Sequence, residues 1–456
     1  MPMVAPNEGA RRGVLVLLWI YFWLLILEGA LRKWVLPQFT DYLLLIRDPL
    51  VLLIYLQASR GGFMGETSRY TIFIFTGITL VCQALYHSTM GVHPIVTLYG
   101  VRTYLLHVPL IFIMPQIVRQ SDIVKFGKWL LFASLPMAVL MGAQYLSPSS
   151  SFLNAATIEG GAQITAVGDI IRPAGTFSFT TGVSCFYRTV FAFCLFGLMI
   201  KTPQLPRWLV LLSMMSIAAA AMVSGSRTFI MSSLIVVAFA LPMLTYFPRL
   251  VPKFILFALV GLLGFVIMYS MPTTRAGLET LVERWTGAAE IEKEGYVTGN
   301  WMGRVFAGPV EAVYWVENAP ALGFGLGLGT NVGGKIMSGS AAMIAPEWEW
   351  PRMIFEAGPL IGGFLIALRL FAAVVFLYYG WEGLRKGKFL GWLLLATVIF
   401  DITQGQLKQP TNLGFLCFFS GLAWAAMVTG MKNTKLTQNQ NLYLRNKIRS
   451  ERELTP

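Results

Sequence analysis

The sequence predicts an all-α polytopic membrane protein of about twelve transmembrane helices, with a large extracytoplasmic loop between the ninth and the tenth. Three observations predict this fold. Hydrophobic residues make up 56% of the chain and charged residues only 12%, whereas soluble domains carry about 25% charged residues. Apolar stretches free of charge recur at lengths that suit a bilayer. Basic residues are concentrated in every second segment between these stretches. The composition excludes a soluble globular protein.

Each expected span is an apolar run bounded by polar turns, with boundaries uncertain by a few residues. The twelve spans cover residues 13–28, 41–57, 70–87, 97–116, 128–146, 182–200, 207–223, 228–246, 253–270, 352–379, 389–405 and 412–430. The first run continues into EGALRKW without a small-residue cleavage site. We therefore expect a retained first span rather than a cleaved signal peptide.

Positive charge predicts the orientation of the chain. With the N-terminus in the cytoplasm, 20 of the 35 lysines and arginines fall in cytoplasmic segments. Every short loop on that side contains at least one of them. The positive-inside rule then places both termini in the cytoplasm of a bacterial-type cell, with the protein in the inner membrane. Residues 431–456 form a basic cytoplasmic tail. The net charge of +13 therefore indicates contact with membrane lipids and not with nucleic acid.

Two segments on the outer side are longer than connectors need to be, at residues 147–181 and 271–351. The second contains aromatic clusters and two helix-like stretches, 276–285 and 304–316, so we expect it to fold as a cap. The predicted organisation is thus nine spans in residues 1–270, the cap in 271–351, three spans in 352–430 and the tail.

The remaining basic residues cluster on the outer side, and arginine outnumbers lysine among them by eleven to four. They are Arg32, Lys33, Arg47, Arg102, Arg172, Arg188, Arg227, Arg275, Arg284, Lys293, Arg304, Lys335, Arg352, Arg369 and Lys408. A charge near the hydrocarbon is costly and needs a partner or a water-filled cavity. Guanidinium groups bind phosphate in a bidentate way, so the set indicates a polyanionic ligand. Snorkelling and salt bridges remain the alternative for each residue.

Other motifs predict no cofactor and no metal. The four cysteines lie in apolar segments without CxxC spacing. The glycine-rich segment GFGLGLGTN at residues 323–331 lacks the strand and the GK[ST] of a nucleotide site, so we expect it to line a cavity. Glu28 and Asp41 are separated by a basic pair and do not indicate a metal site. We expect His87, His93 and His107 to be interfacial or core residues.

Four motifs together resemble the superfamily of O-antigen ligases and O-antigen polymerases, which transfer lipid-linked glycans. They are RPAGTF at residues 172–177, SGSRT at 224–228, NAPALGFG at 318–325 and FEAGPLIGG at 355–363. The resemblance covers residues 95–430 in architecture. The opening third, with EGALRKWVLP and LLIRDP, resembles the family less closely, which indicates a divergent branch.

The resemblance implies a GT-C-like fold and a metal-independent inverting glycosyltransferase at the periplasmic face. Its donor would be an undecaprenyl-diphosphate-linked glycan, and its acceptor a glycan or lipid hydroxyl. We expect polymerisation of an exopolysaccharide or O-antigen repeat rather than ligation to lipopolysaccharide. Other polysaccharide assembly proteins are possible partners. Two alternatives stay open: a flippase or other transporter of lipid-linked oligosaccharide, and an inactive member with a scaffolding role.

The resemblance also implies site residues. The family usually has a histidine nine residues before the glutamate of the last motif, and Glu347 stands in that position before Glu356. We expect catalytic roles for Glu347 as the base and for Arg172 and Arg227 as ligands of the diphosphate. The expected substrate contacts are Arg304, Arg352, Arg102, Arg32, Lys33 and Glu349. Alternatively, Glu347 and Glu349 are solvated loop acids or pair with Arg352.

The predicted orientation can be tested with fusions at two lysines. A reporter that is active only outside the cytoplasm should be active when fused after Lys293 and silent when fused after Lys386. The measurement is reporter activity normalised to the amount of fusion protein. The reverse pattern would place the arginine-rich side in the cytoplasm and contradict the expected chemistry.

Overall fold

The computed structural model describes residues 8–65, 70–157, 171–200, 202–272, 274–279, 282, 301–339 and 345–428. Its helices confirm the predicted all-α class, and the described residues contain no β-strand. Within these ranges, nine helices are long and apolar enough to cross a membrane. The chain is therefore a multi-pass helical membrane protein by length and composition. The expected cytoplasmic tail lies outside the described residues.

These nine helices coincide with nine of the expected spans. They are α1 (Glu8–Ala30) continued by η1 (Leu31–Val35), α4 (Thr71–Thr89), α5 (Pro94–Leu105) with α6 (Leu110–Ile117), α7 (Gln120–Leu146), α8 (Thr180–Met199), α10 (Arg227–Tyr246), η5 (Pro248–Leu250) with α11 (Val251–Tyr269), α15 (Glu349–Arg385) and α17 (Pro410–Val428).

The other three expected spans form shorter helices. Residues 41–57 divide into α2 (Thr40–Leu43) and α3 (Arg47–Arg60), while α9 (Arg207–Val223) and α16 (Phe389–Gln404) contain 17 and 16 residues. At about 1.5 Å per residue, a helix of this length falls short of a hydrocarbon core of about 30 Å. Three of the predicted spans are therefore shorter than a simple membrane-crossing helix.

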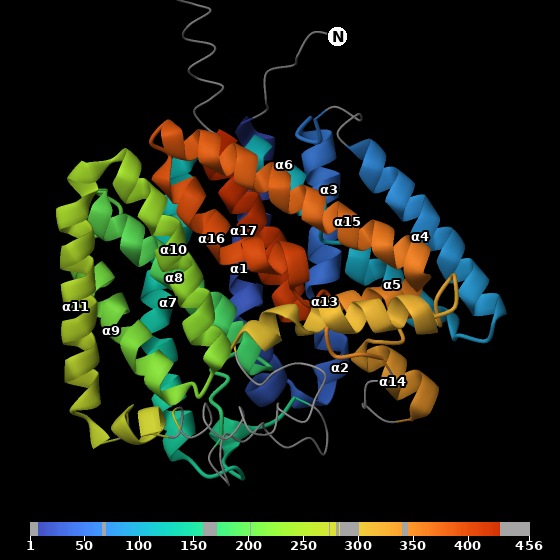
Figure 1. The fold of residues 1–456 in the computed structure, drawn as a ribbon, viewed down its shortest axis with the longest axis horizontal. Coiled ribbons are helices and arrows are strands. Elements are labelled where there is room, and N and C mark those ends of the chain that lie inside the picture. Colours follow the sequence, from blue (N-terminus) through green and yellow to red (C-terminus); the bar gives the residue numbers. More distant parts are fainter. Residues whose placement is uncertain are drawn as a thin grey trace, which may run out of the picture.

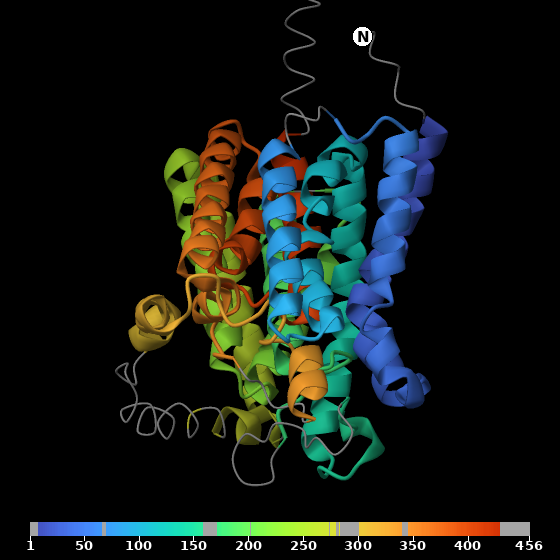
Figure 2. The same cartoon turned by 90° about the vertical axis from the view of Figure 1, so that its right-hand side faces the viewer.

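The helices form a bundle with two distinct ends (Figures 1 and 2). One end, here the N-terminal end, is where α1 begins. At the opposite, distal end lie the residues that follow α7, the helix α13 (Trp301–Asn318) and the short helix α14 (Asn331–Ser338). Both segments expected to be long outer loops therefore have their described parts at the same end of the bundle. This shared location agrees with their assignment to one side of the membrane.

The expected cap is helical where it is described. The stretch predicted at 304–316 lies within α13, and residues 276–279 of the stretch predicted at 276–285 are helical. Residues 283–285, where the first stretch was expected to end, lie outside the described part. The helix α13 runs across the other helices instead of along them (Figure 1).

Burial divides the bundle into central and peripheral helices. Both α8 and α17 are buried on nearly all sides, whereas α11 at the edge exposes most of its apolar side chains. Aromatic rings fill the space between α1, α7 and α17, where Trp19 stacks on Phe126 at 4.0 Å between centroids and Phe126 meets Phe418 edge-on. A helix that is apolar all round packs inside a membrane protein, and one with an exposed apolar face contacts lipid.

The glycine-rich segment 323–331 packs against the protein itself. A Cβ at Gly327 would lie 2.1 Å from the Val96 carbonyl oxygen, and its φ of +84° also favours glycine. On the facing helix α5, a Cβ at Gly100 would lie 2.5 Å from the Gly327 backbone nitrogen. We expected the backbone of this segment to approach a ligand in a cavity. In the structure it approaches the backbone of α5 instead. The segment holds the distal end of the bundle together.

This packing predicts opposite effects for two Gly→Ala substitutions in helices. Gly100→Ala should lower the melting temperature of the detergent-purified protein, because its methyl group meets rigid backbone. Gly142→Ala in α7 is the matched control, since nothing lies within 4 Å of its Cβ, and alanine favours a helix by about 1 kcal/mol over glycine. A Gly100→Ala variant as stable as Gly142→Ala would contradict the packing of the glycine-rich segment on α5.

Candidate functional site

A buried ion-pair network lies at the distal end of α15. The helix begins at Glu349 and is interrupted at Gly358, where φ is 79° and ψ is 167°. Glu349, Arg352 and Glu356 precede this break at spacings of three and four residues, so one helical face presents all three. The FEAGPLIGG motif therefore crosses a helix break, and Pro359 begins the longer part of the helix.

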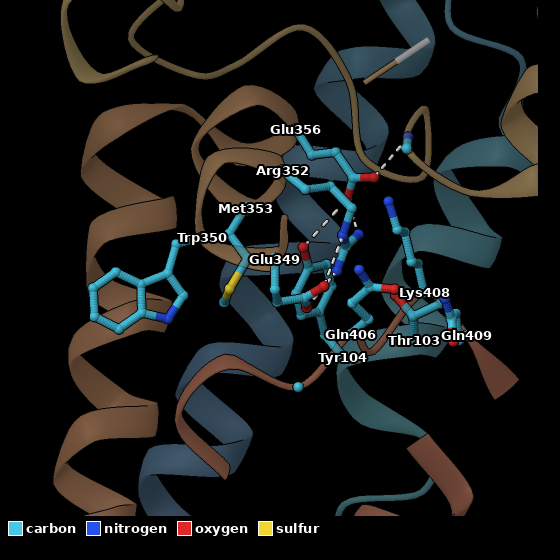
Figure 3. A network of polar contacts seen from close by, with 12 residues as sticks. Thr103, Tyr104, Glu349, Trp350, Arg352, Met353, Glu356, Gln406, Lys408 and Gln409 are labelled. Atoms are coloured by element: carbon cyan, nitrogen blue, oxygen red, sulfur yellow. Dashed lines mark hydrogen bonds and ion pairs between the residues drawn. The ribbon is translucent and has the colours of Figure 1, made fainter. Parts of the chain in front are cut away.

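Arg352 is fully buried between its two carboxylate partners (Figure 3). Its guanidinium donates to Glu349 at 2.7 and 3.1 Å and to Glu356 at 2.7 Å. Glu356 also accepts hydrogen bonds from the Tyr104 hydroxyl at 3.2 Å and from the Gly329 backbone N–H at 2.8 Å. All three guanidinium nitrogens of Arg352 are thus engaged. This geometry favours the alternative of a salt bridge for Arg352 and Glu349 over direct contact with substrate.

Arg369 completes the network from one side. It donates to Glu349 at 3.2 Å and to the backbone carbonyls of Ile402, Asp401 and Gly405 at 2.8, 2.7 and 2.8 Å. Two arginines then balance two glutamates in a region of low dielectric constant, as buried charges require. The network joins α15 to the end of α16. We infer that it fixes the position of the entrance to α15.

A second network connects the opening third of the chain to the rest of the distal end. Arg47 pairs with Glu28 at 2.7 Å and donates to the Pro410 carbonyl at 2.7 Å. Arg32 donates to the Ser178 hydroxyl at 2.8 Å and lies 3.7 Å from Glu28. Lys33 donates to the Gly175 carbonyl at 3.3 Å, within the RPAGTF motif. The predicted substrate contacts Arg32 and Lys33 are therefore buried and make bonds within the protein.

A third group surrounds Asp48. Arg102 forms a bidentate pair with Asp48 at 2.5 and 2.7 Å, and His107 lies 3.1 Å from the same carboxylate. The other ring nitrogen of His107 is 2.9 Å from the Tyr21 hydroxyl. Arg102, expected to contact substrate, is thus engaged with Asp48. Its bidentate geometry is the strong form of such a pair.

The two arginines expected to bind the diphosphate lie near the starts of α8 and α10. Arg227 is the first residue of α10, directly after the N-cap Ser226, whose hydroxyl accepts from the Phe229 N–H. Arg172 lies in the segment that leads to α8, and both arginines are half-buried. The two helix starts meet at the Ser184 and Ser226 hydroxyls, 3.5 Å apart. A helix N-terminus adds partial positive charge beside Arg227.

Glu347 is exposed and lies outside the Arg352 network. Its carbonyl accepts from the Gln406 side chain at 3.2 Å, which ties the segment before α15 to the turn between α16 and α17. The two acids, which the sequence analysis treated together, therefore have different surroundings. Glu349 is a buried partner of Arg352, whereas Glu347 is exposed to solvent.

Two ionisable residues beside Glu347 were not among the expected site residues. Lys408, on the turn between α16 and α17, is only 8% exposed and donates to the Pro346 carbonyl at 3.3 Å. Burial lowers the pKa of Lys408 to about 8, and the positive charge of Arg352 acts in the same direction. Glu311 in α13 accepts from Trp315 at 3.4 Å, and burial raises its pKa, as does the charge of Glu347. The sequence feature that could have indicated Lys408 is its position in a short turn on the outer side.

The remaining expected residues are placed as follows. Leu326 N–H donates to His87 Nδ1 at 3.2 Å, so the His87 Nε2–H donates to the Leu322 carbonyl at 2.8 Å. His93 accepts from the Ile95 N–H and caps α5. Both histidines therefore form hydrogen bonds with backbone groups. Arg304 belongs to α13, but its side chain lies outside the described part.

Two surface hollows lie away from these charged groups. One of about 490 Å³ is bordered by Gln57 and Arg60, and one of about 340 Å³ by Gln120 and Lys388, all at the N-terminal end. Neither is lined by an acidic side chain. They therefore lack a group that could accept a proton from a hydroxyl. We place the candidate site at the distal end, where carboxylates and cations meet.

No protein-family model and no curated protein matches the chain. In the part of the chain that the structure describes, no three His, Cys, Asp or Glu residues gather in a way that could hold a metal ion. The candidate site is therefore defined by residues at the distal end: Lys408, Glu347 and Glu311, which lie near one another, and Arg172 and Arg227 at the starts of α8 and α10.

The buried charge of Lys408 predicts a pH-dependent effect on stability. Below pH 8 the amine is charged in both the folded and unfolded chain, so the cost of burying it is fully present. Between pH 8 and 10.5 only the unfolded chain holds the proton, so stability rises with pH. Lys408→Met should therefore melt at a higher temperature than the unchanged protein at pH 7, and this difference should shrink across that window.

The measurement is the melting temperature in detergent at several pH values. Lys335→Met is the matched control, because Lys335 is exposed on α14 and pairs with Asp41 at the surface. If Lys408→Met melts at a lower temperature than the unchanged protein at pH 7, the amine is not held at an energetic cost. A loss of stability from a buried charge is typical of residues that are retained for activity.

Proposed function

We propose that this protein is a glycosyltransferase that polymerises or transfers undecaprenyl-diphosphate-linked oligosaccharide at the outer face of the bacterial inner membrane. In this proposal the chain crosses the membrane twelve times with a GT-C-like arrangement, and its distal end faces the periplasm. The observation that carries the proposal is that Arg172, Arg227, Lys408 and Glu347 all belong to segments at the distal ends of apolar helices, with Lys408 and Glu347 near each other. Such an arrangement suits a ligand with a lipid tail and a polyanionic head.

The cations suit the departure of a diphosphate. When the bond between the anomeric carbon and the phosphate oxygen breaks, negative charge develops on the leaving group. Fixed cationic donors in a partly dehydrated site stabilise this charge without transferring a proton. Arg172 and Arg227 can supply bidentate contacts, and Lys408 adds a point charge. No metal or cofactor is required for this step.

Glu347 suits the other half of the reaction. The acceptor hydroxyl oxygen forms a bond to the anomeric carbon, and its proton passes to the Glu347 carboxylate. Glu311 is near enough to influence Glu347 electrostatically. A single displacement of this kind inverts the anomeric configuration.

The buried ion pairs serve this site indirectly. Arg352 with Glu349, and Arg102 with Asp48, engage each other and hold helix ends in place. For Arg352, Glu349 and Arg102, which were expected to contact substrate, we propose a positioning role instead. Arg32 and Lys33 join the opening segment to the RPAGTF motif and belong to the same class. Arg304 remains a proposed substrate contact.

A transporter of lipid-linked oligosaccharide is the second candidate. Secondary transporters usually bind substrate near the middle of the membrane between repeated halves. The segments that carry the candidate groups here lie at one end of the bundle. This location favours transfer at a surface over passage through the bundle. Polymerisation is preferred to ligation, with a glycan or lipid hydroxyl as acceptor.

A strain that lacks this protein tests the proposed function. If it is a polymerase, the strain should lose long polysaccharide and accumulate one lipid-linked repeat, measured by gel electrophoresis and mass spectrometry of extracted lipids. Intact polymer that fails to reach its acceptor would indicate a ligase. A repeat trapped on the cytoplasmic side would indicate the transporter and contradict the proposal.

Glu347→Gln tests the base directly, because glutamine keeps the shape of the side chain but accepts no proton. Turnover should fall by roughly 10²-fold or more, while donor binding persists. Glu317→Gln is the matched control, since Glu317 is an exposed acid at the end of α13. Turnover and donor binding would be measured separately with purified proteins. Equal turnover in the two variants would remove Glu347 from the mechanism.

A further inference from the structure

The helix α13 has an orientation unlike that of the other long helices. In Figure 1 it lies across them, and in Figure 2 it is seen end-on at the side of the bundle. It contains 18 residues with Pro309 inside, yet it is not among the nine helices suited to crossing a membrane. It lies beside the bundle rather than beneath it, next to the start of α15.

One face of α13 packs on the protein. The rings of Trp315 and Phe355 meet edge-on with centroids 5.0 Å apart, and Phe324 stacks against Phe355 at 4.7 Å. Ala312 is buried on the same face. Gly308 lies against Trp348, since a Cβ there would be 3.5 Å from the Trp348 side chain. These contacts attach α13 to the start of α15.

The opposite face of α13 carries an uncovered apolar stripe. Phe306, Val310, Val313 and Tyr314 are 55%, 48%, 61% and 53% exposed. Their spacing of four, seven and eight residues places them on one side of a helix. Water in contact with such a stripe is unfavourable by about 25 cal/mol for each Å² of apolar surface. A contiguous apolar surface of this kind marks an interaction site.

The apolar stripe adjoins a surface that faces lipid. Beyond the Gly358 break, α15 exposes Leu360, Phe371 and Val374 at 74%, 59% and 63%. Since α15 is apolar and long enough to span, these side chains contact acyl chains. Because α13 packs on the start of the same helix, its stripe continues this lipid-facing surface at the distal end. A helix that lies flat with one apolar face embedded is the known form of an interfacial helix.

Charge argues that the contact is apolar and not electrostatic. Residues 306–318 contain no lysine or arginine, so nothing in this stretch attracts anionic headgroups. Its acids are Glu311, half-buried on the protein side, and Glu317, which is exposed on the face of the stripe at its far end, four residues after Val313. Glu317 precedes the end of the helix by one residue, where its carboxylate can reach water.

We propose that α13 is an interfacial helix, and that the apolar stripe of Phe306, Val310, Val313 and Tyr314 lies among the lipid acyl chains of the leaflet at the distal end. The occupant of this face is the bilayer itself. The stripe would sit about 5 to 10 Å into the boundary between headgroups and chains. This inference does not depend on the proposed glycosyl transfer.

Site-directed fluorescence in lipid nanodiscs tests the proposal. Among the described cysteines only Cys82 is exposed, so Cys82→Ser gives a background in which one introduced cysteine can be labelled. An environment-sensitive dye at Val313→Cys reports on the stripe. Ser150→Cys, in the exposed loop after α7, is the water control, and Leu263→Cys on exposed α11 is the deep-lipid control.

If the stripe lies in lipid, dye emission at position 313 is shifted to the blue relative to emission at position 150. A quencher attached high on the lipid acyl chain should quench position 313 more than one attached deep, and the order should reverse at position 263. Replacing zwitterionic with anionic lipid should leave the result at position 313 unchanged. Val310→Cys reads the same face independently if the first variant does not fold.

Two outcomes would overturn the proposal. Emission at position 313 equal to that at position 150, without quenching by either lipid, would place the stripe in water. Emission shifted to the blue without quenching by lipid would show that protein covers the stripe, such as a second copy of this chain. Both results leave the glycosyltransferase proposal untouched, because its tests measure glycan products.

Discussion

The constraint on which this structure depends is that a charge near hydrocarbon must have a partner. Arg352 illustrates it most fully: a buried guanidinium lies between two carboxylates, one of which also binds Arg369. Removing one member would leave an uncompensated charge at a cost of about 3 to 5 kcal/mol. The same requirement joins Arg47 to Glu28 and draws the first and last parts of the chain together at the distal end. Packing of the helix ends follows from these pairs.

The pairs also divide the basic residues into two groups by what they can do. Arg102 and Arg352 are held by carboxylates, and we propose a positioning role for them. Arg227 stands instead at the first turn of a helix, and Lys408 is buried at an energetic cost beside the exposed acid Glu347. A site for a lipid-linked diphosphate needs both groups: rigid walls and cations directed at the ligand. The interfacial placement of α13 would bring acyl chains to the edge of that site.

Sequence periodicity and charge predicted the helical membrane class, the shared end of the two long segments and the helix at 304–316, because these depend on local apolar runs. Pairing between distant segments, such as that of Arg102 with Asp48, left substrate contact and a salt bridge as open alternatives in the sequence, whereas the structure shows the salt bridges of Arg102 and Arg352. The glycine-rich segment was expected to approach a ligand but approaches α5, since a glycine pattern shows where backbone comes close and not to what. Lys408 stood in a short turn that gave little signal.

Reconstituted transfer tests the account most directly. Purified protein would be incubated with an undecaprenyl-diphosphate-linked repeat and a metal chelator, and glycan length and released undecaprenyl diphosphate would be measured together. We expect longer glycan, with one undecaprenyl diphosphate released for each repeat added. For Arg227→Lys, which keeps the charge but lacks the bidentate fork, we expect the rate of transfer to fall by about 10²-fold or more. No transfer by the unchanged protein, or full transfer by Arg227→Lys, would contradict the account.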